Sequence, residues 1–146
     1  MLRTLEIIKK TLTVGGRGWL QGIKNDQTGE WITPKNLADK LKKDPDFDKC
    51  KCIRLYSCST GKGENSFAEQ LAKETGKPVE APDEVAWFGP TGKGYVAPPK
   101  NPSDPISKWK PDLTNKGSYK RFDPKGGSKK IPFPKAKGFF SRLFGR

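Results

Sequence analysis

The strongest local signals in the chain lie at residues 53–87, IRLYSCSTGKGENSFAEQLAKETGKPVEAPDEVAW. The apolar, β-rich segment Ile53–Tyr56 predicts a short buried strand. Ser66 with Glu69 three residues later forms a capping box, which predicts the start of a helix, and Gly76 predicts its end. A buried strand placed between two helical segments predicts an α/β domain with a parallel sheet.

A second helix is predicted upstream of this stretch. Thr33 has the side chain of an N-cap, and Pro34 suits the first helical position. The helix is expected to end near Lys43. Three apolar residues fall on one of its faces: Leu37, Ala38 and Leu41.

Further strands are predicted on both sides of the two helices. Residues 5–14 read as a strand pair or as one helical turn followed by a strand, and residues 19–23 read as a short strand. Residues 85–88 and 95–96 can pair as a hairpin around the turn at 89–94. The fold class predicted from these signals is α/β, with a small, mainly parallel sheet flanked by helices.

Charge divides the chain unevenly. Its 146 residues carry a net charge of +13 and only 32% hydrophobic residues. Residues 1–98 have a net charge of +3, whereas residues 99–146 have 13 Lys/Arg, three Asp/Glu and seven prolines. From Pro98 onward we expect extended chain, ordered by aromatic anchors at Trp109, Tyr119 and Phe122. We therefore predict one domain over residues 1–127 and an extended basic tail over residues 128–146.

The basic carboxyl-terminal part predicts an anionic partner. Residues 99–146 suit nucleic acid, an acidic protein or an anionic membrane, and a solvated segment is the alternative. The end of the chain, GFFSRLFGR at 138–146, is short for stable membrane binding and reads as a docking peptide or a frayed end. We predict no transmembrane segment and no signal peptide for this sequence. Secretion or injection would therefore need a dedicated system.

The three cysteines predict reduced thiols rather than a disulfide framework. Cys58 follows a predicted buried strand, which is a position for a nucleophile or for a structural cysteine. The chain has no histidine, so a Cys-His dyad within it is excluded. The spacing of Cys50, Cys52 and Cys58 fits a zinc site poorly, and we predict no metal and no cofactor.

Lys62 lies in a loop that has only part of a phosphate-binding motif. Gly61 and Lys62 match the end of that motif, but Tyr56 stands where its first glycine belongs and Gly63 follows the lysine. The loop is therefore a turn rather than a nucleotide loop. A weaker anion site at the start of the following helix, with Lys62 as its cation, is the remaining possibility.

Several of these segments together resemble a known domain. The runs 53–61 (IRLYSCSTG), 66–72 (SFAEQLA), 78–82 (PVEAP) and 85–87 (VAW) are similar to a domain found at the C-termini of bacterial polymorphic toxins, in RHS and contact-dependent effectors. The resemblance covers residues 53–87 closely and extends back to Thr11. Such domains look like a caspase-type α/β fold of the gingipain and CHAT group, in which a His-Gly follows one strand and a cysteine ends the next.

The resemblance implies a function and a site. It implies a toxin or effector domain, either a cysteine-centred hydrolase or an inactivated member, with a cognate immunity or carrier protein and action in a reducing, cytosolic compartment. Cys58 would be the nucleophile, and Arg17 stands at the position of the family histidine. Arginine cannot accept a proton, so it cannot serve as general base. The pocket residues would be Gly16, Gly18, Ser57, Ser59, Thr60 and Gly61.

A second hypothesis needs no catalysis. The folded part is then a scaffold, and the basic tail engages an acidic protein, nucleic acid or membrane.

Overall fold

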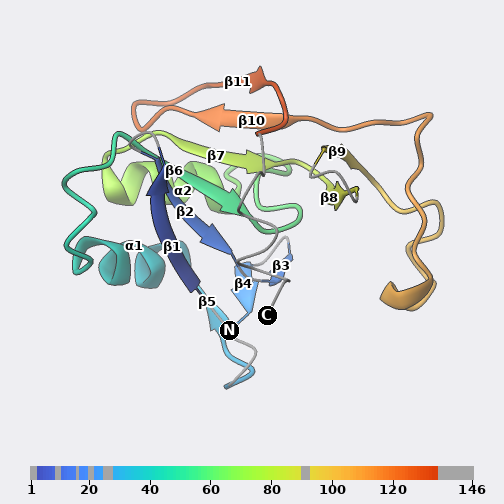
Figure 1. Ribbon diagram of the computed structural model, residues 1–146, viewed down its shortest axis with the longest axis horizontal. Helices are drawn as coiled ribbons and strands as arrows, with labels where there is room; N and C mark the ends of the chain where they lie inside the picture. The colour runs from blue at the N-terminus through green and yellow to red at the C-terminus, as the bar shows by residue number, and fades with distance from the viewer. Residues whose placement is uncertain are drawn as a thin grey trace.

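A computed structural model of the chain describes residues 3–8, 11–15, 17–19, 22–24, 28–89 and 93–134, with side chains described at 11–14, 23–24, 28–89 and 93–134. Figure 1 shows the arrangement of the elements. The strands are β1 Arg3–Ile8, β2 Thr11–Gly15, β3 Arg17–Trp19, β4 Gly22–Lys24, β5 Trp31–Ile32, β6 Cys52–Tyr56, β7 Val79–Pro82, β8 Val85–Phe88, β9 Gly94–Ala97, β10 Tyr119–Phe122 and β11 Ser128–Ile131. The helices are α1 Pro34–Lys42, α2 Phe67–Thr75 and the 3-10 helix η1 Ile106–Lys108.

The main sheet has six strands in the order β1-β2-β6-β7-β10-β11. Its strands β2, β6 and β7 are paired in parallel. The other pairs are antiparallel: β1 with β2, β10 with β7, and β11 with β10. Parallel neighbours need crossover connections, and here the connections contain α1 and α2. The predicted α/β class is confirmed, and the sheet is mixed because its outer strands are added by hairpins and by the return of the chain at β10.

Both α-helices begin and end where the local signals predict. The Thr33 hydroxyl accepts the backbone N–H of Asn36 at 3.1 Å, and the Ser66 hydroxyl accepts that of Glu69 at 3.2 Å. Gly76 ends α2 with a left-handed φ of 71°. Among the described residues, no helix is long and apolar enough to cross a membrane.

The two α-helices pack on the same face of the sheet. One core contains the buried residues of α1 and α2 together with alternate residues of four strands: Leu12, Val14, Ile53, Leu55, Val79, Ala81 and Phe122. The sheet is thus covered by these helices on one side only, whereas the sequence predicted helices flanking it. Residues of the intervening positions point to the other face, because successive side chains of a strand alternate.

The amino-terminal strands follow the strand-pair alternative. β1 and β2 form an antiparallel pair, and the predicted strand at 19–23 is divided between β3 and β4 of a separate sheet, β3-β4-β5. The predicted hairpin near residue 90 is confirmed as β8 paired with β9.

The chain after Pro98 is more ordered than the sequence predicted. β10 pairs with β7, and β11 pairs with β10, so both extend the main sheet (Figure 1). The predicted boundary at residue 127 falls in the turn of this hairpin, and the start of the predicted tail is therefore a strand of the sheet. Two predicted anchors, Tyr119 and Phe122, are buried in β10. Residues 135–146 lie outside the described part of the chain.

Candidate functional site

Cys58 follows β6 at the carboxyl end of the parallel strands. Its side chain is partly exposed, and burial raises the pKa of its thiol, although hydrogen bonds to the backbone of Ala86 and of Cys58 itself oppose that rise. A raised pKa keeps the group as a thiol at neutral pH, and the thiolate is the nucleophilic form. In the described part of the chain, no charged side chain lowers the pKa of Cys58.

The loop around Cys58 is held by its own contacts. Ser57, Thr60 and Gly61 are buried, and the Thr60 hydroxyl donates to the Ser57 carbonyl at 2.8 Å. The Gly61 N–H donates to the Pro82 carbonyl at 2.8 Å, and a side chain at Gly61 would place its Cβ 3.0 Å from the Ala81 carbonyl oxygen. Gly61 therefore joins the loop to β7, whereas the contact between Thr60 and Ser57 lies within the loop.

Ser59 and Lys62 are both tied to Glu84. The Ser59 N–H donates to the Glu84 carbonyl at 3.1 Å, and Ser59 has a positive φ of 60°. The Lys62 ammonium lies 2.6 Å from a Glu84 carboxylate oxygen. An anion at Lys62 would have to compete with this carboxylate.

The backbone brings Arg17 and Cys58 to the same edge of the sheet. Strands β2 and β6 are paired up to the last residue of each, and Arg17 and Cys58 each follow two residues later. Gly18 pairs with Ile23 between β3 and β4. The Arg17 side chain and the whole of Gly16 lie outside the described residues, so their place beside Cys58 stays a prediction.

The other two cysteines have structural contacts. The Cys50 thiol donates to the Phe47 carbonyl at 3.1 Å, and the Cys52 sulfur lies 3.3 Å from the Thr11 hydroxyl oxygen. All three cysteines are free thiols. Within the described ranges, no group of three or more His, Cys, Asp or Glu side chains could hold a metal ion.

A row of charged residues crosses the face of the sheet opposite the α-helices. Arg54, Glu80, Arg121 and Lys129 are direct neighbours in register across β6, β7, β10 and β11. Arg54 Nε lies 2.9 Å from Glu80 Oε1, and Arg121 Nη1 lies 3.5 Å from Glu80 Oε2. We call these four residues the charged row.

Exposure in the charged row increases toward the edge of the sheet. The Glu80 side chain is 8% exposed, that of Arg54 22% and that of Arg121 38%, and Lys129 is exposed. A buried carboxylate needs a cationic partner, and Glu80 has two. Burial of Arg54 works against its charge, but the attraction and hydrogen bond of Glu80 prevail, so the pKa of Arg54 is raised. With three cations and one carboxylate, the row keeps a surplus of positive charge at its exposed end.

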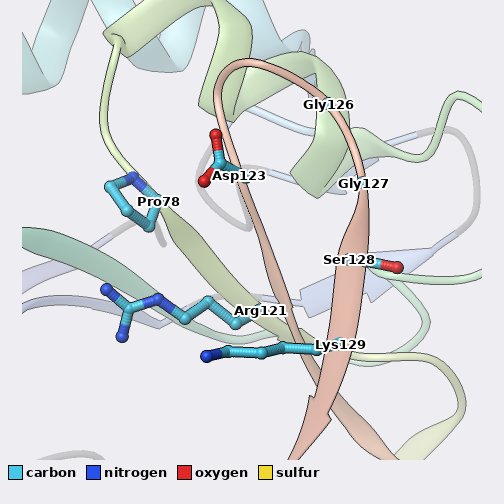
Figure 2. Close-up of a pocket in the computed structure, with 7 residues that line it drawn as sticks. All are labelled: Pro78, Arg121, Asp123, Gly126, Gly127, Ser128 and Lys129. Atoms are coloured by element: carbon cyan, nitrogen blue, oxygen red, sulfur yellow. The ribbon is translucent and has the colours of Figure 1, made fainter.

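A groove of about 640 Å³ lies at that exposed end, between the β10–β11 hairpin and Pro78. Figure 2 shows the side chains of Arg121 and Lys129 extending side by side along it. Asp123 also lines the groove, and its carboxylate accepts the backbone N–H of Lys125 at 2.8 Å within the turn. The groove therefore combines two cations with one carboxylate that is already engaged.

An aromatic cluster lies beside the charged row. Its members are Tyr56, Phe88, Tyr119 and Phe133, with ring centroids 5.3 to 6.2 Å apart in the contacting pairs. The Tyr119 hydroxyl donates to the Leu55 carbonyl, which holds the cluster against β6. A second cavity, of about 210 Å³, is lined by Tyr119, Phe133 and residues of β9.

Sequence reasoning missed the charged row, although two signals for it are visible. Glu80 is the single carboxylate in the otherwise apolar segment 79–82, and a carboxylate in a buried strand demands partners. The turn residues at 123–127, DPKGG, separate two four-residue runs and indicate a hairpin. Neither signal identifies Arg121 as the second partner of Glu80.

The fold and the site define an α/β domain with α-helices on one face of a mixed sheet and a charged row on the other. The chain belongs to a family described as a domain of unknown function, DUF8616, which matches residues 2–96. Arg54 and Glu80 lie inside the matched range, whereas Arg121 and Lys129 lie beyond it.

One relative is the uncharacterized protein YibJ of Escherichia coli (strain K12), which is 39% identical over 61 residues. These residues are 42% of this chain and 26% of YibJ, so the similarity spans about a quarter of that protein. No solved structure matches the chain.

Proposed function

We propose that this chain is a bacterial toxin- or effector-type domain that acts by binding nucleic acid, without using Cys58 as a nucleophile. The observation that carries the proposal is the composition of the β10–β11 hairpin. Its two paired strands contain Lys120, Arg121, Lys129 and Lys130 and no carboxylate. Clustered cations of this kind neutralise phosphates, which is the main source of affinity for nucleic acid.

The environment of Cys58 supports a role other than thiol catalysis. The pKa of the Cys58 thiol is raised, and the chain has no histidine to act as its base. This favours the inactivated-member alternative among the functions implied by the resemblance. The proposal of a toxin or effector domain rests on the resemblance of the motifs at 53–87. The proposal of a cognate immunity or carrier protein rests on the same resemblance.

Binding of a fluorescent single-stranded RNA, measured by anisotropy over a range of salt concentrations, tests this function. We expect binding that weakens steeply with salt, with log K falling by about 0.7 per phosphate contact for each unit of log salt. Cys58→Ala should leave both the affinity and any toxicity on expression in a bacterial host unchanged.

Three results would overturn the proposal. The first is no RNA binding at low salt. The second is equal affinity for polyglutamate or for anionic vesicles, which would point to an acidic protein or a membrane instead. The third is loss of toxicity in a folded Cys58→Ala variant, which would return the thiol to the mechanism.

A further inference from the structure

The exposed cations of the charged row have unused hydrogen-bonding capacity. Glu80 engages Arg54 through Nε and Arg121 through one terminal nitrogen. A guanidinium carries five N–H donors in a fixed plane, so Arg121 keeps several for another acceptor. Glu80 is buried and fixes where the Arg121 guanidinium lies, which prepares it for a ligand.

The groove beside these cations can admit an extended ligand. Gly126 and Gly127 form its rim with φ values of 112° and 85°, and a Cβ at either position would meet no atom within 4 Å. The turn therefore presents bare backbone at one end of the groove that Arg121 and Lys129 also line (Figure 2). A volume of about 640 Å³ is in the range that holds small ligands.

A mainly apolar cavity lies two residue pairs further along the same hairpin. Tyr119 and Ile131 are partners in register, two residues from the partners Arg121 and Lys129, and they line the cavity of about 210 Å³. Two residues along a strand correspond to about 7 Å. A cationic groove next to an aromatic-lined cavity suits a ligand with alternating anionic and planar apolar parts, which describes single-stranded nucleic acid better than an acidic peptide.

We propose that the groove between Pro78 and the β10–β11 hairpin binds a phosphodiester group of single-stranded RNA through Arg121 and Lys129. A guanidinium and an ammonium side by side can donate to the two free oxygens of one such group. The neighbouring base then lies toward the cavity at Tyr119 and Ile131. This site rests on the proposed function, because it specifies where the nucleic acid is held.

Two neighbouring lysines on β11 provide a matched test. Lys129 and Lys130 are both exposed and carry the same charge, but they lie on opposite faces of the strand, and only Lys129 lines the groove. In the anisotropy assay, Lys129→Gln should weaken RNA binding about tenfold, the loss of one charge-assisted hydrogen bond. It should also reduce the salt slope by about 0.7. Lys130→Gln should have a much smaller effect on both.

A third variant examines the geometry of the arginine. Arg121→Lys keeps the charge but removes the planar guanidinium. The affinity for the RNA phosphate should therefore fall, while the general attraction for polyanions is retained.

NMR spectra provide an independent test. Titration with the RNA should shift the amide signals of Gly126 and Gly127 in the wild-type chain. Thermal unfolding of each variant establishes that it is folded.

The outcomes separate the site from the function. If the wild-type chain binds RNA but Lys129→Gln and Lys130→Gln weaken it equally, the site is wrong and the function stands. The site is equally excluded if RNA is bound without any shift at Gly126 and Gly127. If the wild-type chain does not bind RNA at all, the proposed function fails and this site fails with it.

Discussion

Glu80 is the residue on which the polar face of the sheet depends. Its carboxylate is buried between the guanidinium groups of Arg54 and Arg121, on two different neighbouring strands. Removing the negative charge would leave two cations facing each other with no compensating partner. The cost of breaking a buried ion pair is larger than that of breaking an exposed one, because the remaining charge stays out of water.

We expect Glu80→Gln to lower the free energy of unfolding by about 2 kcal/mol, a value reduced from that of a fully buried pair because Arg121 is partly exposed. Glu84→Gln is the control, since Glu84 pairs with the more exposed Lys62 and its loss should cost less than about 1 kcal/mol. Urea unfolding measures both values. Equal losses in the two variants would show that Glu80 has no special place in the sheet.

Cys58 is predicted to be a slow nucleophile with a defined pH dependence. Burial raises the pKa of its thiol, so the thiolate forms only at a pH above that of a free cysteine. Alkylation of Cys58 by iodoacetamide in the native chain, followed by mass spectrometry, should be slower than alkylation of free cysteine at pH 7 and should accelerate toward alkaline pH.

The same raised pKa means that the folded state holds the proton of the Cys58 thiol more tightly than the unfolded state. Its contribution to stability is therefore present below the unfolded pKa and falls as the pH rises above it. Faster alkylation of Cys58 than of free cysteine at pH 7 would contradict the raised pKa of its thiol.

The β10–β11 hairpin is the element that completes both the fold and the candidate site. β10 supplies Tyr119 and Phe122 to the interior and Arg121 to the charged row, and β11 covers its outer edge. Phe133, just beyond β11, packs against Phe88 and Tyr119. The hairpin is thus a structural part of the domain as well as a source of charge.

Two truncated chains test how much the hairpin contributes to the stability of the domain. A chain that ends at Gly127 loses β11 and Phe133, whereas a chain that ends at Pro134 retains every described residue. We expect the shorter chain to be less stable than the longer one by about 2 kcal/mol or more, since burial of an aromatic side chain alone contributes that much. Thermal or urea unfolding compares the two directly. Equal stabilities would mean that the predicted boundary at residue 127 is the correct one.

The whole molecule is asymmetric about its main sheet. One face is sealed by α1 and α2 over an apolar core, and the other carries the charged row and the aromatic cluster. Of the cations in residues 99–146, Arg121 contributes to that second face, and Lys120, Lys129 and Lys130 lie with it on the outer strands of the sheet. Two of these cations, Arg121 and Lys129, line the groove beside the hairpin.

The sequence by itself determined the features that depend on neighbours in the chain. The ends of α1 and α2 follow from Thr33, Pro34, Ser66 and Gly76, because capping and left-handed termini involve residues within one turn. The buried strand β6 and the α/β class follow from an apolar run between two helices. The prediction of Cys58 at the end of that strand was also local, and its position is confirmed.

Only the tertiary structure decided which distant residues meet. Arg54 and Glu80 are 26 residues apart, and Glu80 and Arg121 are 41 apart, so their contact depends on strand order and register. Likewise, β10 and β11 lack the regular alternation that marks a half-buried strand, and they become strands because β7 offers an edge for pairing. The surroundings of Cys58 also depend on folding. Ala86 lies 28 residues further along the chain, and the hydrogen bond to its backbone lowers the pKa of the Cys58 thiol against the larger rise that burial causes. The candidate site inferred from the structure is therefore the charged row, whereas the sequence predicted the cysteine loop, because contacts between distant strands form only in the folded chain.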